Sequence, residues 1–246
     1  TTEAAVIAGD IRSGIKYLAL LAKEEPRPTE IDQLAYLEGS IKQMQGNFPG
    51  AIKAWEEVEK GRHRPSVAKS VLARTELLLT TKKISKKDVI KELENLRFSW
   101  RGGDFEFSLL HKLGLLYLDS DEYRKGLRTL RTAISNFRGH PKGAEVTQRM
   151  EAAFSELYLN GAADKISPIR SLALFEEFKE LTPTGKTGDE LIQKLADRLA
   201  AVDLLEKAAE LLEQQIEFRL TGVDKARVGA QLATIYILDK KPAKAL

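Results

Sequence analysis

The segment that most resembles a chemical motif is Thr184–Thr187, which reads Thr-Gly-Lys-Thr. A Gly-Lys-Thr run holds phosphate when it closes a glycine-rich loop between a strand and a helix. That loop needs another glycine five residues before Gly185, but position 180 is Glu180, and the flanking sequence has helical periodicity. We therefore predict a polar loop between two helices over 182–188, and no phosphate site.

Metal and thiol chemistry is also missing from the sequence. The three histidines, His63, His111 and His140, lie far apart, and none has a second histidine or a carboxylate at the spacing of a zinc site. The chain has no cysteine, which excludes disulfides, thiol nucleophiles and cysteine metal sites. We predict no metal and no cofactor. The absence of cysteine fits an exported bacterial protein, in the periplasm or cell envelope, better than a cytosolic one.

Neighbouring carboxylates are plentiful, as in Glu56-Glu57 and Asp189-Glu190. A catalytic carboxylate pair needs two different environments that separate the two pKa values. Adjacent residues on an amphipathic helix are instead typical of a solvated face, and no nucleophile with a neighbouring base is recognisable. We therefore predict that the protein is not an enzyme and has no catalytic residues.

Composition restricts the classes of partner. The 246 residues are 43% hydrophobic and 30% charged, which is enough for a sizeable core. No apolar run approaches the roughly 20 residues that cross a bilayer, and no signal peptide is visible, so we predict no membrane insertion. The net charge of +3 comes from 39 basic and 36 acidic residues. Because nucleic-acid binders usually carry a larger and clustered excess, we predict no nucleic-acid partner.

Almost every long segment has the apolar periodicity of a helix, and none alternates as a strand does. We predict helices over 11–24, 29–45, 49–60, 66–81, 85–97, 105–118, 121–137, 142–159, 168–181, 189–201, 204–220 and 224–238. Asp104 is the predicted N-cap of the helix over 105–118.

A spacing of twelve between small residues organises these helices into pairs. The spacing separates Gly39 from Ala51, Gly114 from Gly126, Ala196 from Ala208, and Ala233 from Ala245. A residue that tolerates a turn stands five before each second member: Gly46, Asp121, Asp203 and Lys240. This arrangement predicts antiparallel helix pairs that approach closely at the small residues. The first helices are centred near 37, 73, 112, 150, 195 and 231, and a recurrence of about 36 to 45 residues indicates stacked helical hairpins.

The pairs resemble tetratricopeptide repeats. The best match consists of Leu113, Gly114, Tyr117, Tyr123, Gly126, Leu130, Ala133 and Pro141, and the next of Gly39, Gly46, Phe48, Ala51, Trp55 and Val58. The pairs over 66–97 and 142–181 depart from the pattern. The segment 96–102 is also similar to segments of large alphaproteobacterial repeat proteins. The resemblance implies an all-α, right-handed superhelical solenoid of about six antiparallel helix pairs.

We expect 1–246 to form a single solenoid domain. Both ends of the sequence fall inside a repeat pair, and repeat arrays normally end in polar capping helices. We therefore expect the chain to be a fragment of a longer repeat protein.

The resemblance implies a scaffold that binds a protein or peptide on the concave face, which the first helices line. The predicted contact residues are Gln33, Tyr36, Lys42, Gln43, Lys112, Leu116, Arg149, Lys194 and Gln231. Their mixture of lysine, glutamine and tyrosine favours a polar or acidic partner. The alternative is an architectural or assembly component of a bacterial cell-envelope or motor complex, which would self-associate.

Two further groups of residues have alternative interpretations. Arg124, Arg128 and Arg131 form one stripe along a helix, either as a solvated outer face or as a contact for an acidic partner. Phe98 and Trp100 alternate with arginines and could stack on a ligand, but we expect them to be buried at a junction between helices.

Overall fold

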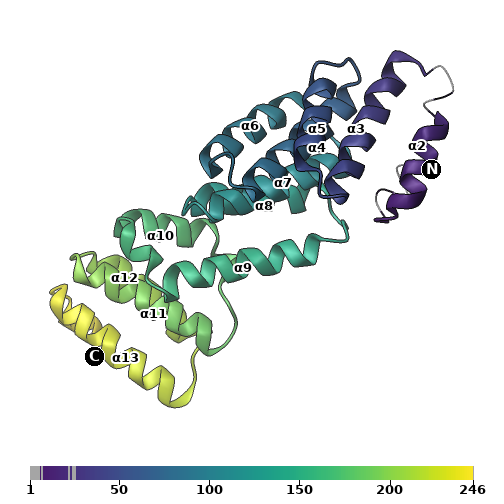
Figure 1. Ribbon diagram of the computed structural model, residues 1–246. Helices are drawn as coiled ribbons and strands as arrows, with labels where there is room; N and C mark the ends of the chain where they lie inside the picture. Colours follow the sequence, from purple (N-terminus) through teal and green to yellow (C-terminus); the bar gives the residue numbers. More distant parts are fainter. Residues whose placement is uncertain (1–5, 7, 22, 24–25, 246) are drawn as a thin grey trace. The chain divides into compact units, whose positions relative to one another are not determined.

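The computed structural model describes residues 6, 8–21, 23 and 26–245, and their regular structure is helical throughout, as predicted (Figure 1). The contacts divide the chain into two compact units, Thr1–Phe137 and Arg138–Leu246. Unit 1 contains α2 (Ile11–Leu21), α3 (Pro28–Met44), α4 (Phe48–Glu59), α5 (Arg64–Thr80), α6 (Lys86–Ser99), α7 (Gly103–Leu118) and α8 (Tyr123–Asn136). Unit 2 contains α9 (Gly143–Leu159), α10 (Pro168–Glu177), α11 (Lys186–Ala201), α12 (Leu205–Phe218) and α13 (Gly222–Leu238).

Three short 3₁₀ helices complete unit 2: η1 (Ala162–Lys165), η2 (Lys179–Leu181) and η3 (Pro242–Lys244). Most helix boundaries lie within three residues of the predicted ones. The helix predicted over 168–181 is shorter than expected, because α10 ends at Glu177 and η2 follows it. Part of the helix predicted over 11–24 lies outside the described residues. Among those described, none of the helices is long and apolar enough to cross a membrane.

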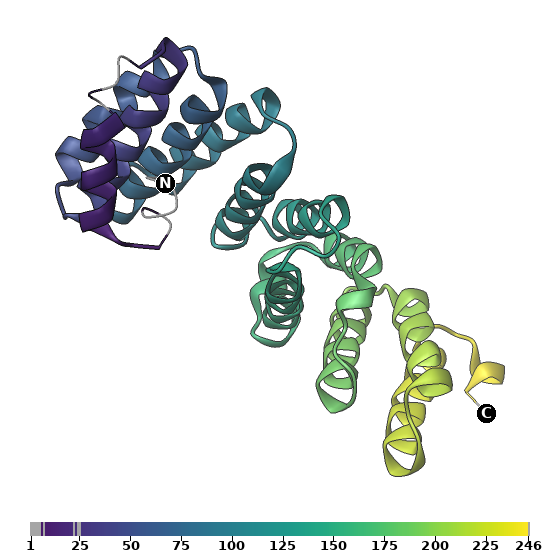
Figure 2. The same cartoon turned by 90° about the vertical axis from the view of Figure 1, so that its right-hand side faces the viewer.

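Most consecutive helices pack against each other in both units (Figure 2). In unit 1, α3 packs on α4, α5 on α6 and α7 on α8, and in unit 2, α11 packs on α12. The first helices of neighbouring pairs also touch, since α3 contacts α5 and α9 contacts α11. This is the tetratricopeptide-like packing that the sequence predicts.

Gly114 and Gly126 mark the closest approach of α7 and α8. A Cβ added to Gly126 would lie 2.7 Å from the Leu118 side chain and 3.0 Å from the carbonyl oxygen of Gly114. A Cβ added to Gly114 would lie 2.6 Å from the Leu130 side chain. The predicted role of the twelve-residue spacing is therefore confirmed in this pair. In unit 2 the corresponding Ala196 and Ala208 are both fully buried.

The turns within the pairs share one unusual backbone conformation. The predicted turn positions Gly46, Asp121, Asp203 and Lys240 all have positive φ. Lys82, in the turn of the diverged pair α5–α6, has positive φ as well. Each turn closes with the same bond, as when the Glu122 N–H donates to the Tyr117 carbonyl at 2.9 Å. In each turn, the N–H of the residue that follows the positive-φ residue donates to the carbonyl four residues before the positive-φ residue. This bond closes the end of the first helix in the manner of a Schellman motif.

Lys82→Gly is expected to raise the free energy of unfolding by about 0.5–1 kcal/mol. Lys82 is exposed with a φ of 56°, a conformation that costs residues with a Cβ more than it costs glycine. Urea unfolding of Lys82→Gly and Lys82→Ala would separate the effect of the backbone conformation from the effect of losing the lysine side chain. Alanine removes the rest of the side chain but keeps the Cβ. Equal stability of the two variants would contradict this account.

Arg198 of α11 makes polar contacts to η1 and α10, which belong to the pair over 142–181 that departs from the repeat pattern. Its Nε lies 2.8 Å from Asp164 Oδ1, its Nη1 donates to Ser171 Oγ at 3.1 Å, and its Nη2 donates to the Ala163 carbonyl. The Tyr158 hydroxyl donates to the Ser171 carbonyl at 2.8 Å. These polar contacts fix η1 and α10, where the small-residue spacing is absent.

The buried Tyr158 hydroxyl is expected to make the free energy of unfolding of unit 2 decrease at alkaline pH. Burial raises the pKa of Tyr158 well above its usual value of 10.0. Because the folded state holds this proton more tightly than the unfolded state, the stability contribution is complete below about pH 10 and falls above it. The stability difference between wild type and Tyr158→Phe should narrow by up to about 1.4 kcal/mol per pH unit above pH 10. Urea unfolding followed by circular dichroism at pH 8–11.5 measures this difference, and a constant difference would contradict the assignment.

Two local predictions are wrong. Gly102, not Asp104, caps α7, and its N–H donates to the buried carboxylate of Glu106 at 2.5 Å. Asp104 instead lies in the first turn of α7, because the helix begins at Gly103. Phe98 is not in the core but 78% exposed at the end of α6. Trp100 is half-buried and packs edge-on against Phe105, with ring centroids 5.5 Å apart.

Candidate functional site

The first helices of unit 1, α3, α5 and α7, are joined side by side by their own side chains. Lys69 Nζ of α5 lies 5.8 Å from the centroid of the Tyr36 ring on α3. Lys112 Nζ of α7 lies 3.1 Å from Glu76 Oε1 of α5. We call the surface formed by these three helices the first-helix row of unit 1.

Unit 2 has an equivalent row made by α9, α11 and α13. Lys194 Nζ of α11 donates to the Leu159 carbonyl at the end of α9, at 3.1 Å. Gln231 Nε2 of α13 donates to Asp197 Oδ1 of α11, at 2.5 Å. In both units, a side chain of one first helix therefore reaches back to the preceding first helix.

Three of the predicted contact residues occupy the same repeat position. Lys112, Lys194 and Gln231 each stand two residues before the small residue of their first helix. The structure gives all three a packing role, because each one holds its helix to the preceding first helix. Their expected role in partner binding stays a prediction.

The other predicted residues divide between core and surface. Leu116 is 4% exposed and packs in the core between α6 and α7, so its predicted place on the binding surface is wrong. Lys42 and Arg149 form ion pairs within their own helices, with Glu38 at 2.6 Å and Glu156 at 3.5 Å.

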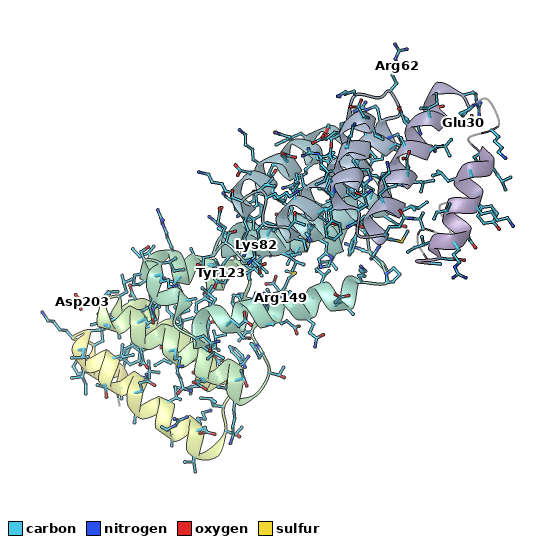
Figure 3. All side chains as sticks on the ribbon, viewed as in Figure 1. Glu30, Arg62, Lys82, Tyr123, Arg149 and Asp203 are labelled. Atoms are coloured by element: carbon cyan, nitrogen blue, oxygen red, sulfur yellow. The ribbon has the colours of Figure 1, made fainter. Side chains whose placement is uncertain are left out.

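One set of predicted residues does share an accessible face. Gln33 and Gln43 are exposed on α3, and Tyr36 is half-buried beside Lys69. The offsets of three and seven residues within this set place all three side chains on one face of the helix. The predicted residues of unit 2, Arg149, Lys194 and Gln231, lie on three different helices (Figure 3 labels Arg149 on α9).

A second surface, which the sequence prediction did not contain, is a cavity of about 410 Å³ between α6, α7 and α8. We call it the basic cavity. It is lined by Glu94, Arg97, Tyr117, Lys125, Arg128, Thr129 and Thr132. Of the predicted arginine stripe, Arg128 lines the cavity, whereas Arg124 and Arg131 are not among its lining residues.

The centre of the basic cavity is a fixed set of polar contacts. The Tyr117 hydroxyl donates to Glu94 Oε1 at 2.7 Å, and Arg97 Nη1 lies 3.4 Å from the same oxygen. Lys125 Nζ lies 5.3 Å from the centroid of the Tyr117 ring and 2.5 Å from Glu122 Oε2. Burial, together with the bond to Glu94, raises the pKa of Tyr117 far above its usual range, so its hydroxyl keeps its proton.

The same three-residue arrangement recurs in unit 2. Tyr236 of α13 donates to Glu213 of α12, and Lys244 Nζ lies 5.4 Å from the Tyr236 ring centroid. Burial and the bond to Glu213 raise the pKa of Tyr236 to about 12. In both units the glutamate stands 23 residues before the tyrosine. This shared spacing is a sequence signal that would have revealed the arrangement.

The structure also places the Thr184–Thr187 segment and His63, which the sequence raised as possible chemical sites. Residues 186–187 of the Thr184–Thr187 segment already lie in α11, and Gly185 is its N-cap with a φ of 67°. The predicted loop is thus shorter, since α11 begins at Lys186 and not at Asp189. His63 Nδ1 lies 2.8 Å from Ser66 Oγ, next to the start of α5. The described part of the chain contains no cluster of three or more residues that could hold a metal.

The sequence matches no protein-family model and no curated protein. Among solved structures, it is similar to a tetratricopeptide repeat protein from Parabacteroides merdae, with 15% identity over 99% of this chain and 86% of that chain and a TM-score of 0.46. A chain of the APC/C hetero-tetramer Cut9-Hcn1 has 12% identity over 99% of this chain and 43% of that chain, with a TM-score of 0.48. The MamA protein has 18% identity over 79% of this chain and 98% of that chain, with a TM-score of 0.42. All three TM-scores are below 0.5, and it is the packing of the helices in pairs that defines the architecture of this chain.

Proposed function

We propose that the protein is a non-catalytic scaffold that binds a protein or peptide partner on its first-helix row. The observation that carries the proposal is the shared face of Gln33, Tyr36 and Gln43 on α3. The apolar residues of the helix pairs are buried between helices, whereas this face presents two amides and an aromatic ring. Such side chains bind peptides, because amides bond to main-chain groups and a ring covers apolar area at little entropic cost.

The charge beside this face favours a polar or acidic partner. Lys69 lies against the Tyr36 ring, and Lys112 is half-exposed beside Glu76. A positively charged side chain next to an aromatic ring can meet a carboxylate on the partner while the ring supplies contact area.

Gln33→Glu combined with Gln43→Glu is expected to weaken partner binding by about tenfold or more, because two like charges would face an acidic partner. Partners would be captured from source cells on the immobilised chain and identified by mass spectrometry. The dissociation constant of each would then be measured. Gln45→Glu combined with Gln214→Glu is the matched control, since it adds the same charge at exposed sites outside the shared face of α3. Equal binding by the two double variants would remove the first-helix row from consideration.

Charge reversal at Lys42 and Lys112 is also expected to weaken binding without unfolding the chain. This pair is a less direct test, because the new carboxylates would lie beside Glu38 and Glu76. The glutamine variants change charge at almost constant shape, so they report on the partner contact itself.

The second candidate function is assembly, as an architectural component of a bacterial cell-envelope or motor complex. It is favoured by the large apolar side chains that are exposed near α13: Phe218, Val223, Ile237 and Leu238. Phe218 and Val223 lie near the start of α13, Ile237 and Leu238 lie at its end, and large exposed apolar side chains can mark contacts between proteins. Light scattering distinguishes this role, because self-association would rise with concentration and fall in Ile237→Ser combined with Leu238→Ser.

A further inference from the structure

The turn between α5 and α6 and the first two turns of α6 carry a group of exposed lysines. Residues 82–91 contain five lysines and one aspartate, and all five lysines are exposed (Figure 3 labels Lys82). We call Lys82, Lys83, Lys86, Lys87 and Lys91 the lysine patch. We propose that the lysine patch binds the surface of a membrane that contains anionic lipids, at a site separate from the first-helix row.

The positive charge of the lysine patch is not neutralised within the fold. Four of its members, all except Lys86, form no ion pair with any residue that the structure describes. Lys86 Nζ donates to the Asp119 carbonyl at 3.2 Å and lies 3.9 Å from the Asp119 carboxylate. The one aspartate of the segment, Asp88, accepts the Ser85 hydroxyl at 2.6 Å. Four of the five ammonium groups are therefore open to an anion outside the chain.

The lysines weaken the segment in which they lie. Lys87 and Lys91 stand four residues apart on α6, and like charges at this spacing repel each other. Lys86 and Lys87 lie in the first turn of α6, where the helix dipole favours acidic side chains over basic ones. The fold does not compensate this cost, which favours an anionic partner for these side chains.

The turn between α7 and α8 shows that the fold does not require lysines at these positions. Lys82 has the positive φ that closes its turn, and the matching residue of the α7–α8 turn is Asp121. The residue that follows is Lys83 in one turn and Glu122 in the other. The apolar residues hold the segment in place, since Val89 is 0% exposed in the core of α5, α6 and α7. The lysines are thus free to serve a contact outside the fold.

An extended anionic surface suits this group of side chains. A lysine presents a compact charge on a flexible stem and has no fork of fixed geometry. Anionic lipids move laterally in a membrane, so their headgroups can gather around such charges. Each lysine close to an anionic membrane strengthens binding by about fivefold, so that a group of five gives measurable attachment.

Nucleic acid and acidic peptides fit the lysine patch less well. Residues 82–91 contain no aromatic ring on which a base could stack. They also contain no arginine, whose planar guanidinium pairs with both oxygens of a carboxylate side chain. Both classes of partner are therefore included in the test as alternatives.

The test measures binding of the full chain to sucrose-loaded vesicles by sedimentation at low salt. Vesicles of equal parts phosphatidylglycerol and phosphatidylcholine should bind the chain at least about tenfold more tightly than vesicles of phosphatidylcholine alone. Lys83→Gln combined with Lys87→Gln should weaken binding to the anionic vesicles by about twentyfold, at about fivefold for each lysine. Binding should also fall as sodium chloride is added, because salt screens exposed charges.

Two further double variants serve as controls. Lys16→Gln combined with Lys53→Gln is the matched control, because it removes two exposed lysines of unit 1 that lie outside the lysine patch. It should change binding by less than about threefold, since charges far from the membrane are screened. Lys83→Arg combined with Lys87→Arg keeps both charges and should bind within about twofold of the wild type.

Four results would overturn the proposal. Equal binding to the two kinds of vesicle would show that no site for an anionic surface exists, and equal weakening by the two glutamine double variants would show a diffuse effect of net charge. Tighter binding of an oligothymidylate or of tetraglutamate than of anionic vesicles, at equal concentrations of anionic groups, would assign the lysine patch to nucleic acid or to an acidic peptide. Displacement from the vesicles by inorganic phosphate, beyond that by sodium chloride of equal ionic strength, would assign it to a single phosphate group.

A second pair of lysines keeps the test decisive if a variant does not fold. If circular dichroism shows that Lys83→Gln combined with Lys87→Gln is unfolded, Lys82→Gln combined with Lys91→Gln is measured with the same expected loss.

Discussion

Trp55→Ala is expected to lower the free energy of unfolding of unit 1 by about 3–5 kcal/mol. The indole is 0% exposed and packs with Ala51 and Leu77 between three helices. Its Nε1–H donates to the Tyr36 carbonyl at 3.2 Å, so truncation removes this bond as well as opening a cavity. Gly39 makes the fit tight, since a Cβ there would lie 2.4 Å from the indole nitrogen.

Urea unfolding followed by tryptophan fluorescence measures this loss in unit 1 alone. The chain has two tryptophans, and in Trp55→Ala the signal comes from Trp100 of the same unit. Trp55→Phe is the control, because it keeps most of the buried volume and loses mainly the hydrogen bond, at about 1–3 kcal/mol. A loss below about 1 kcal/mol in Trp55→Ala would show that this core contact is not needed for stability.

Gly126→Ala is expected to destabilise unit 1 by about 1–3 kcal/mol, although alanine is the better helix former. The added Cβ would lie 3.0 Å from the backbone oxygen of Gly114, and a backbone atom cannot turn away as a flexible side chain can. The strain must therefore be relieved by separating α7 from α8, which would loosen the packing around Leu130. Tryptophan fluorescence during urea unfolding again reports on unit 1.

Gly229→Ala provides the matched control with the opposite sign. Gly229 lies within α13, and a Cβ added there would have nothing within 4 Å. The substitution should gain helix propensity without strain and stabilise unit 2 by up to about 1 kcal/mol. If both glycine variants changed stability in the same direction, close helix approach would not be the reason for Gly126.

Local sequence signals predicted the helices and the turns between them because both depend on neighbouring residues. The periodicity of apolar residues locates a helix without knowledge of its partner. Gly46, Asp121, Asp203 and Lys240 could be recognised as turn positions, and all four have positive φ. Phe98 shows the limit, because its aromatic side chain suggested burial but no neighbouring helix covers enough of it.

The candidate binding surfaces were predicted only in part. The shared face of Gln33, Tyr36 and Gln43 could be predicted, because it depends only on the spacing of these residues along one helix. Leu116 was placed on that surface wrongly, because its burial depends on how α7 packs against α6. The acceptors of Lys112, Lys194 and Gln231 lie on the preceding first helix, and no local pattern indicates them.

By itself, the sequence determined the helix pairs, their close crossing at small residues and their shared turn, since these depend on spacing along the chain. Only the tertiary structure decided which charged groups meet. It brings Arg97 of α6 and Arg128 of α8 to one cavity over Tyr117 of α7. The physical reason is that charges far apart in sequence interact through the distance between packed helices, and the packing of buried side chains such as Leu93 and Leu113 sets that distance.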